Sequence, residues 1–370
     1  MPQVPLTDVG GTSRFWPSAG SFSFFPDTES VPQRRLGLKM LYGPATREGP
    51  VFRTLPDGKP PSSRPAFPLS GEAMTEPSPQ ADKKSVEDLI DLLDLERIEE
   101  NLFRGHSPDV SWQRVFGGQV IGQALVAAYR TVEERVCHSL HAYFIRPGDP
   151  KVPIVYEVDR SRDGKSFTTR RVVAIQHGKQ IFNLAASFQV PETGFEHQAE
   201  MPKVPMPEEL ASEREHRKAI AEKLPPEIAK HFSRPRPIEI RPVNPQDYID
   251  PAPMEPLQHV WFRARKSVSD EIALHQCILA YASDMTLLDT CIRPHGVSWV
   301  SGKLQSASLD HAMWFHAPFR SDEWLLYTQD SPSASGARGL NRGSIYTREG
   351  KLVASVAQEG LIRYRGAPKG

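Results

Sequence analysis

Two long segments of this chain follow the same plan, and this internal repeat constrains the fold more than any other sequence feature. The first segment opens with SLHAYFIRP at Ser139–Pro147, and the second opens with SLDHAMWFHAP at Ser308–Pro318. Each opening is followed by runs of alternating apolar and polar residues, which are typical of β-strands. Two glycines delimit a run in each segment, and their spacing is the same in both: Gly164–Gly178 and Gly336–Gly350. We therefore expect two domains built on one β-rich plan.

The chain of 370 residues is long enough for two such domains. Residues 1–80 are rich in Pro, Gly and Ser and show no sustained period, which predicts a disordered extension, with Met74 as an alternative start. The first domain is predicted over 85–195 and the second over 257–366. Between them, 196–256 is rich in proline and charge and is predicted to be an inter-domain connection.

The composition excludes several classes of partner. The chain carries 45 Lys and Arg against 45 Asp and Glu, so no overall field favours nucleic acid. No apolar run approaches the ~20 residues that a membrane-spanning helix needs. The three cysteines show no metal-type spacing and no disulfide framework, which indicates a reducing compartment. With no secretory signal at the start and no SKL-type tripeptide at the end, we expect a cytoplasmic protein with no nucleic acid partner and no integral membrane segment.

The first domain is predicted to contain a buried helix. The segment after Gly117 and Gly118 leaves almost no polar face over VIGQALVAAY. Glycines at the start of this helix would let a ligand oxygen approach free backbone N–H groups, or they would allow close packing against the sheet. Upstream, Ser85 and Asp88 resemble a capping box that opens a short helix. Downstream, His177–Gly178 marks the turn of a β-hairpin.

In the second domain, the segment 272–283 is predicted to be a strand. It reads IALHQCILAYAS, in which both alternating faces are mostly apolar, as in a strand buried on two sides. Asp284 follows this segment and precedes MTLLDTCI, whose spacing is helical. Asp284 would therefore stand where a strand passes into a helix, and Asp is a preferred N-cap at such a position.

Several polar residues stand within otherwise apolar stretches of the second domain. Covalent catalysis is not indicated, because the sequence has no GxSxG motif and no cysteine with a paired histidine at a suggestive spacing. Buried polar side chains need partners, so several of these residues should meet in space. They are Asp284, Ser308, Asp310, His311 and Gln358.

With these motifs, the chain resembles the acyl-CoA thioesterase II family. The shared strings include LFRG, VFGGQVIGQAL and FIRPGDP in the first domain and LHQCILAYASD, SLDHAMWFHAPF and LVASVAQEG in the second. The resemblance implies an α+β double hotdog fold, in which two antiparallel sheets each wrap round a central helix. It also implies hydrolysis of medium- to long-chain fatty acyl-CoA to free fatty acid and CoA, without metal or cofactor, by a homodimer or homotetramer.

The same resemblance assigns residues to the site. The family holds the attacking water with an Asp, a Thr or Ser, and a Gln, and the matching positions are Asp284 in YASD, Ser308 in ASLDH and Gln358 in VAQEG. Ser308 stands where bacterial members have Thr, and it keeps the hydroxyl group. Candidate contacts to the substrate are Gly117, Gly118, His311 and Trp314.

The chemistry of a thioester suits such a set of residues. A thioester carbonyl is electrophilic enough for a positioned water to attack it, given a base and donors for the developing oxyanion. We expect the dipole of the helix after Asp284 to keep this carboxylate ionised. Backbone N–H groups just after Asp284 or near Gly117 and Gly118 are the candidate oxyanion donors. The first domain has Ala186 or a neighbour where the second has Gln358, so the second domain should carry the catalysis.

Two other hypotheses stay open at this point. A hotdog hydratase or dehydratase acting on enoyl or hydroxyacyl thioesters would keep the fold, but it would need an acid–base Asp/His pair. A non-catalytic acyl-CoA-binding protein would keep the ligand and lack turnover.

Overall fold

The computed structural model describes residues 79–108, 114–222 and 236–366. The predicted extension 1–80, with Met74, therefore lies outside the described residues except for its last two positions. The repeat and all the candidate site residues lie within them.

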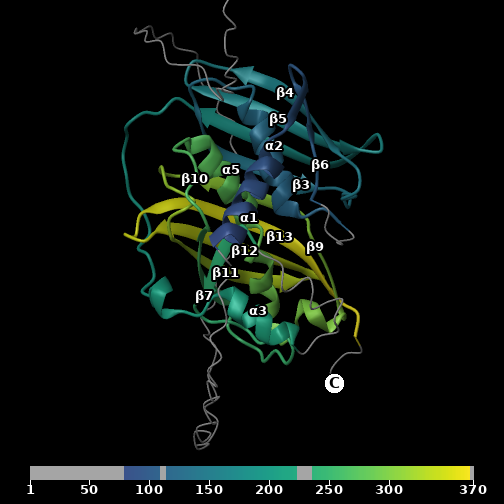
Figure 1. The fold of residues 1–370 in the computed structure, drawn as a ribbon, viewed down its shortest axis with the longest axis vertical. Helices are drawn as coiled ribbons and strands as arrows, with labels where there is room; N and C mark the ends of the chain where they lie inside the picture. Colours follow the sequence, from purple (N-terminus) through teal and green to yellow (C-terminus); the bar gives the residue numbers. More distant parts are fainter. Residues whose placement is uncertain (1–78, 109–113, 223–235, 367–370) are drawn as a thin grey trace, which may run out of the picture. The chain divides into compact units, whose positions relative to one another are not determined.

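One antiparallel sheet of 13 strands runs through both halves of the described chain (Figure 1). Its order is β1-β2-β4-β5-β6-β3-β10-β13-β12-β11-β8-β7, with β9 paired to β13. The first-half strands are β1 (Glu96–Glu99), β2 (Leu102–Gly105), β3 (Val136–Phe144), β4 (Ile154–Asp163), β5 (Phe167–Gln176) and β6 (Lys179–Gln189). The second-half strands are β7 (Ile238–Pro242), β8 (Leu257–Ala264), β9 (Leu304–Ser308), β10 (Asp310–Phe315), β11 (Leu325–Ser335), β12 (Arg338–Thr347) and β13 (Leu352–Tyr364). The two predicted sheets are joined edge to edge by β3 and β10, where His141 lies opposite Ala312.

Helices α2 (Gly117–Tyr129) and α5 (Ile272–Ser283) pack against each other (Figure 1). The predicted buried helix is confirmed by α2, since nearly all of its residues are buried. Each half contributes one of these central helices, which gives the double hotdog fold. The other helical segments among the described residues are α1 (Pro79–Leu93), η1 (Pro207–Glu209), α3 (Glu213–Ala221), η2 (Leu287–His295) and η3 (Trp299–Ser301).

Two local predictions are wrong. The segment 272–283 forms helix α5 and not a strand. A helix that is buried on all sides has apolar residues on both alternating faces, so its pattern matches that of a two-sided strand, and its Ala and Leu content favours the helix. The helix α1 begins at Pro79, so Ser85 lies inside it and does not cap it. The hairpin at His177–Gly178 is confirmed, because both residues have positive φ, as the type I′ turn of a two-residue hairpin loop requires.

The predicted connection 196–256 contributes to the core of the second half. It contains η1, α3 and β7, and the indole N–H of Trp261 donates to the carbonyl oxygen of Pro205 at 2.9 Å. Its apolar residues pack on a cluster formed by β8, β11 and β12 and the residue before β11. The cluster is Trp261, Trp324, Leu326 and Tyr346, with Met201, Val204, Leu210 and Val243 packed against it.

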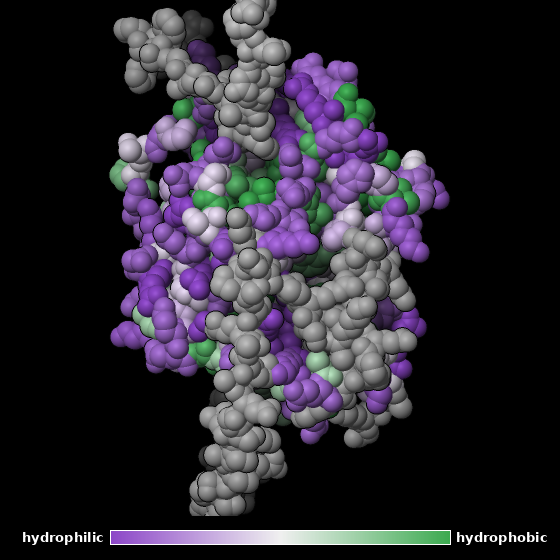
Figure 2. Space-filling view, in the orientation of Figure 1, coloured by the Kyte–Doolittle hydropathy of each residue, from purple (hydrophilic) through white to green (hydrophobic). Residues whose placement is uncertain are grey.

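Figure 2 shows a largely hydrophilic face on which apolar residues gather over the region that α2 and α5 occupy in Figure 1. Within the described parts of the chain, no helix combines the length and the apolar character that crossing a membrane requires. The pair α2 and α5 is also the part of the fold that positions the candidate site.

Candidate active site

Helices α2 and α5 run antiparallel, which places the start of α2 beside the end of α5. A Cβ atom on Gly118 would lie 2.2 Å from the carbonyl oxygen of Tyr281, and one on Gly122 would lie 3.3 Å from that of Cys277. A side chain at Gly118 has no room, so glycine is required for this close approach. The same approach brings the first N–H groups of α2, which lack partners within the helix, to the end of α5.

Asp284 is the C-cap of α5, and its carboxylate accepts hydrogen bonds from three separate elements. Gln358 Nε2 on β13 lies 2.7 Å from Asp284 Oδ1, and Ser308 Oγ on β9 lies 3.4 Å from the same oxygen. The backbone N–H of Gly118 also donates to this carboxylate. A Cβ atom on Gly117 would lie 2.6 Å from Asp284 Oδ2, so the second oxygen faces the first turn of α2. The structure thus brings Asp284, Ser308 and Gln358 together.

The carboxyl group of Asp284 has a raised pKa. Burial raises this pKa from its ordinary value of 3.8 to about 6, while hydrogen bonds from Gln358, Gly118 and Ser308 oppose the rise. The predicted N-cap position is wrong, because Asp284 stands at the negative, C-terminal end of its own helix. The helix end that favours its charge is the start of α2, from the other half of the chain. A carboxylate with a pKa of about 6 is mostly ionised at neutral pH and can still accept a proton.

Ser308 and Gln358 are held in place by the pairing of β9 with β13. Ser308 lies opposite Gly360, two residues beyond Gln358. Asp310 accepts the backbone N–H of Glu359 at 2.6 Å, which fixes β13 next to the amide side chain. Gln358 itself has no accessible surface. These contacts fix the backbone of β13 next to Gln358.

The predicted substrate contacts lie in different surroundings. Gly117 and Gly118 are next to Asp284 at the start of α2. His311 has no accessible surface, and its Nε2 lies 2.9 Å from Ser283 Oγ. The two glycines therefore border the carboxylate directly, whereas His311 lies behind the site.

Trp314 lies on the face of β10 opposite to that of His311, because the two positions differ by three residues in a strand. Its ring meets the ring of His141 edge-on, with centroids 5.2 Å apart. The structure does not bring Trp314 to Asp284.

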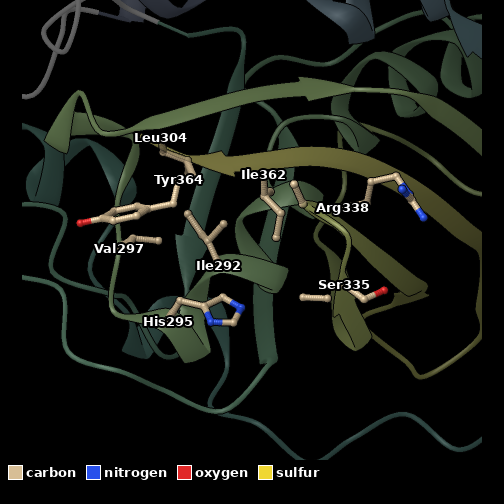
Figure 3. Close-up of a pocket in the computed structure, with 10 residues that line it drawn as sticks. Ile292, His295, Val297, Leu304, Ser335, Arg338, Ile362 and Tyr364 are labelled. Carbon is tan, nitrogen blue, oxygen red and sulfur yellow. The ribbon is translucent and has the colours of Figure 1, made fainter. Parts of the chain in front are cut away.

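A pocket of about 370 Å³ lies between η2 and the strands β9, β11, β12 and β13 (Figure 3). Its apolar lining includes Ile292, Leu304 and Ile362, and Arg338 and Tyr364 also border it. Figure 3 shows Ile292 and Ile362 next to each other, with Tyr364 and Arg338 extending to opposite sides of them. The lining is suited to an apolar group of a ligand, with the polar groups of Arg338 and Tyr364 at the border of the pocket.

This pocket lies along the same strand as the candidate site. Ile362 and Tyr364 lie on the same face of β13 as Gln358, because every second residue of a strand points to the same side. At about 3.3 Å per residue, Ile362 is roughly 13 Å from Gln358 along the strand. Leu288 lies between them, since a Cβ atom on Gly360 would be 2.2 Å from its Cδ1. The site and the pocket therefore share one strand face, with Leu288 at their junction.

Comparison with known proteins identifies the family. The acyl-CoA thioesterase family model matches residues 229–361, and the model of the acyl-CoA thioesterase N-terminal domain matches residues 106–189. The chain is 41% identical to acyl-CoA thioesterase 2 of Haemophilus influenzae, over 75% of this chain and 97% of that protein. The chain belongs to the acyl-CoA thioesterase II family. The resemblance drawn from the motifs is confirmed, and the protein is a thioester hydrolase.

Other relatives cover a similar share of this thioesterase. Human acyl-coenzyme A thioesterase 8 is 44% identical over 78% of the chain and 92% of the human protein. The crystal structure of an acyl-CoA thioesterase II from Mycobacterium marinum is 46% identical, covers 76% of this chain and 98% of that one, and superposes with a TM-score of 0.61. Both halves of the fold are therefore shared with these proteins.

Two contacts of the thioesterase site were not predicted. The bond from Gly118 to Asp284 joins the two halves, and no sequence pattern gives the distance between helices from different halves. Ser283 was also missed, although it directly precedes Asp284 at the end of a buried run, where a hydroxyl needs a partner.

Proposed function

We propose that Asp284, Ser308 and Gln358 of this acyl-CoA thioesterase hold the water that attacks the thioester. One observation carries the proposal: two side-chain donors from separate strands converge on Asp284 Oδ1, at 2.7 Å from Gln358 and 3.4 Å from Ser308. Their arrangement restrains the carboxylate, and its pKa of about 6 suits a general base at neutral pH.

The reaction then proceeds without a covalent intermediate. Asp284 accepts a proton from the water as the water oxygen bonds to the carbonyl carbon. The second N–H of Gln358 and the lone pairs of Ser308 orient this water. When the tetrahedral intermediate collapses, the C–S bond breaks and CoA leaves as the thiolate, which takes a proton from Asp284 or solvent. The products are a free fatty acid and CoA.

The start of α2 provides the donors for the developing oxyanion. The N–H of Gly118 already donates to Asp284, but the other first N–H groups of a helix have no partner within the helix, and the dipole there favours negative charge. Gly117 has no side chain to block a carbonyl oxygen. The alternative donor, the N–H of Met285 after Asp284, already bonds to the carbonyl oxygen of Ala282 at 3.0 Å. This favours α2 over the end of α5.

For the acyl group we favour medium to long chains. The apolar pocket lined by Ile292 and Ile362 lies on the same face of β13 as Gln358, about four residues further along. A short acyl group would end before Leu288, whereas a longer one would reach the pocket once Leu288 turns aside. The pocket thus gives additional apolar contact to longer chains.

A hydratase or dehydratase is disfavoured by the surroundings of His311. Such an enzyme needs a histidine that reaches the substrate beside the carboxylate. The ring of His311 lies behind the site and bonds to Ser283 through Nε2, whereas the side chains that reach the carboxylate are those of Gln358 and Ser308.

A single turnover in H₂¹⁸O, with enzyme in excess over palmitoyl-CoA, tests direct attack by water. The proposal expects one ¹⁸O atom in the fatty acid formed in the first turnover. If Asp284 instead attacked the carbonyl and formed an anhydride, and water then attacked the Asp284 carbon and broke its bond to the bridging oxygen, the first turnover would leave that ¹⁶O atom in the fatty acid and place ¹⁸O in Asp284. Mass spectrometry of the fatty acid distinguishes these two outcomes.

Thiol release by Asp284→Asn tests the role of the carboxylate. We expect a fall in kcat of ~100-fold, comparable with the loss of one key polar group in other hydrolases. The matched control is Asp289→Asn, because Asp289 is another partly buried carboxyl with a raised pKa, and it accepts the indole N–H of Trp299 instead of bonds from Gln358 and Ser308. Wild-type activity in Asp284→Asn would refute the mechanism.

A further inference from the structure

His311 and Gln358 are cross-strand neighbours in the interior of the second half. On β10 and β13, Ala312 lies opposite Ala357, and one further step of this register places His311 opposite Gln358. Both side chains have no accessible surface. Both face the end of α5, because His311 contacts Ser283 and Gln358 contacts Asp284.

In each of the two side chains, one polar atom has a hydrogen-bond partner and the other has none. Nε2 of His311 lies 2.9 Å from Ser283 Oγ, and Nε2 of Gln358 donates to Asp284 Oδ1 at 2.7 Å. In the described part of the chain, His311 Nδ1 and Gln358 Oε1 find no hydrogen-bond partner of good geometry. The side chain of Gln358 nevertheless acts as a hydrogen-bonding neighbour that raises the pKa of His311, against the stronger lowering by burial to about 4. The two atoms without a partner thus belong to neighbouring cross-strand residues, and each is of the kind that the other could bond.

The neutral imidazole carries one N–H, and its position decides whether these atoms pair. With the proton on Nε2, His311 donates to Ser283, and its bare Nδ1 faces the Gln358 oxygen, so that two buried acceptors oppose each other. With the proton on Nδ1, His311 donates to Gln358 Oε1, and the Ser283 hydroxyl donates to Nε2. The second arrangement pairs both buried atoms, and buried polar atoms without partners are costly.

We propose that His311 is a positioning residue for thioester hydrolysis: its Nδ1–H holds the carboxamide oxygen of Gln358, so that the amide nitrogen points at Asp284. The proposal rests on the function assigned above to Asp284 and Gln358. Without this donor, the carboxamide of Gln358 could rotate by half a turn. Its oxygen would then face the carboxylate of Asp284, and the two oxygens would repel each other. His311 thus acts through Gln358 and touches neither water nor substrate.

The other half of the fold lacks this pair, as expected if the pair serves catalysis and not folding. On β3 and β6, Leu140 lies opposite Ala186, four residues from the pair Phe144 and Phe182. On β10 and β13, His311 and Gln358 stand four residues from the pair Phe315 and Ala354. The equivalent positions in the first half are therefore apolar. The C-cap of the first-half central helix α2 is Arg130, whereas the C-cap of α5 is Asp284.

Two amide substitutions separate the roles of the ring nitrogens. In His311→Asn the amide nitrogen occupies the position of Nδ1, whereas in His311→Gln it occupies the position of Nε2. We expect His311→Asn to keep kcat within a few-fold of wild type. We expect His311→Gln and His311→Leu, which copies Leu140, to lose ~10-fold or more in kcat with little change in KM, a size typical of residues that orient a functional group. The reverse order of Asn and Gln would overturn the proposal.

The tautomer of His311 can be measured without any assay of activity. In protein labelled with ¹⁵N in the histidine rings, the long-range proton–nitrogen spectrum tells which nitrogen carries the proton, and the signal of His311 is the one that His311→Asn removes. A proton on Nδ1 is expected. A proton on Nε2 would overturn the contact with Gln358, whatever the mechanism of hydrolysis.

A double-mutant cycle tests whether His311 acts through Gln358. If it does, His311→Leu with Gln358→Leu loses no more kcat than Gln358→Leu alone, in proteins whose thermal unfolding shows that they are folded. Additive losses would mean that His311 acts elsewhere and would overturn the proposal. If Gln358→Leu alone kept wild-type kcat, the proposed function would fail, while the tautomer measurement would still decide the contact.

Discussion

Gln358 and Asp284 are 74 residues apart in the chain, yet the amide nitrogen of the first lies 2.7 Å from the carboxylate of the second. This bond ties the last long strand, β13, to the end of helix α5. It is also one of the contacts that hold the pKa of Asp284 below the value that burial alone would produce. The identity of residue 358 should therefore set both the activity and its dependence on pH.

The substitution Gln358→Glu keeps the shape of the side chain and replaces a donor with a second carboxyl group. Two carboxylates at this distance cannot both ionise, so they would share a proton and the apparent pKa of the site would rise. We expect the acid limb of kcat against pH to move up by at least ~1 unit, with activity at pH 7 strongly reduced and partly recovered at pH 9. Thiol-release assays between pH 5 and 9 measure this. An unchanged limb would mean that Gln358 does not contact the base.

The wild-type enzyme should lose activity as Asp284 becomes protonated. Because burial raises the pKa of Asp284 to about 6, kcat/KM should fall below pH 6 and reach a plateau above pH 7. Asp289 has a pKa raised to about 7 by burial and could produce a similar limb. The variant Asp289→Asn separates the two, since it should leave the limb in place. A limb that disappears in Asp289→Asn would contradict the assignment to Asp284.

The resemblance carried by the motifs implied the double hotdog fold and the grouping of Asp284, Ser308 and Gln358, while the residues alone predicted only a repeated β-rich plan and buried polar side chains that need partners. They did not predict the electrostatics of Asp284. The period of the segment 272–283 cannot separate a helix buried on all sides from a strand buried on two, so Asp284 was predicted at the start of the next helix instead of at the end of α5. The contact with Gly118 depends on how two central helices from different halves approach each other, which local sequence does not encode.

The protonation of Asp284 should also change stability. Since the folded-state pKa, about 6, lies above the ordinary value of 3.8, the folded protein holds the proton more tightly than the unfolded chain between these pH values. Ionisation therefore lowers the free energy of unfolding as pH rises from 4 to 6, by at most about 3 kcal/mol. In Asp284→Asn this loss is absent, so the variant should gain stability relative to wild type on going from pH 4 to pH 8. Urea unfolding at both pH values measures the difference, and a difference that does not vary with pH would contradict the raised pKa.

A methyl group at Gly118 should force the two central helices apart. Its Cβ atom would lie 2.2 Å from the carbonyl oxygen of Tyr281, and backbone atoms cannot move aside cheaply. We expect Gly118→Ala to lower the free energy of unfolding by ~1–3 kcal/mol and to reduce kcat, because the helix start would move away from Asp284. The matched control is Gly194→Ala, where a Cβ atom would meet nothing within 4 Å. Equal behaviour of the two variants in unfolding and thiol-release assays would mean that the close approach is not needed.

The pocket beyond Gln358 should determine which acyl chains are preferred. Ile362 lines this pocket on the same strand face as Gln358, so Ile362→Trp would fill the space that the end of a long chain is proposed to occupy. We expect kcat/KM for palmitoyl-CoA to fall ~10-fold or more, in line with the loss of several buried methylene contacts, while kcat/KM for hexanoyl-CoA stays near wild type. The control is Leu340→Trp, because Leu340 is exposed on β12 and does not line the pocket. An equal loss for both substrates would point to damage at Asp284, and no loss for either would place the acyl chain elsewhere.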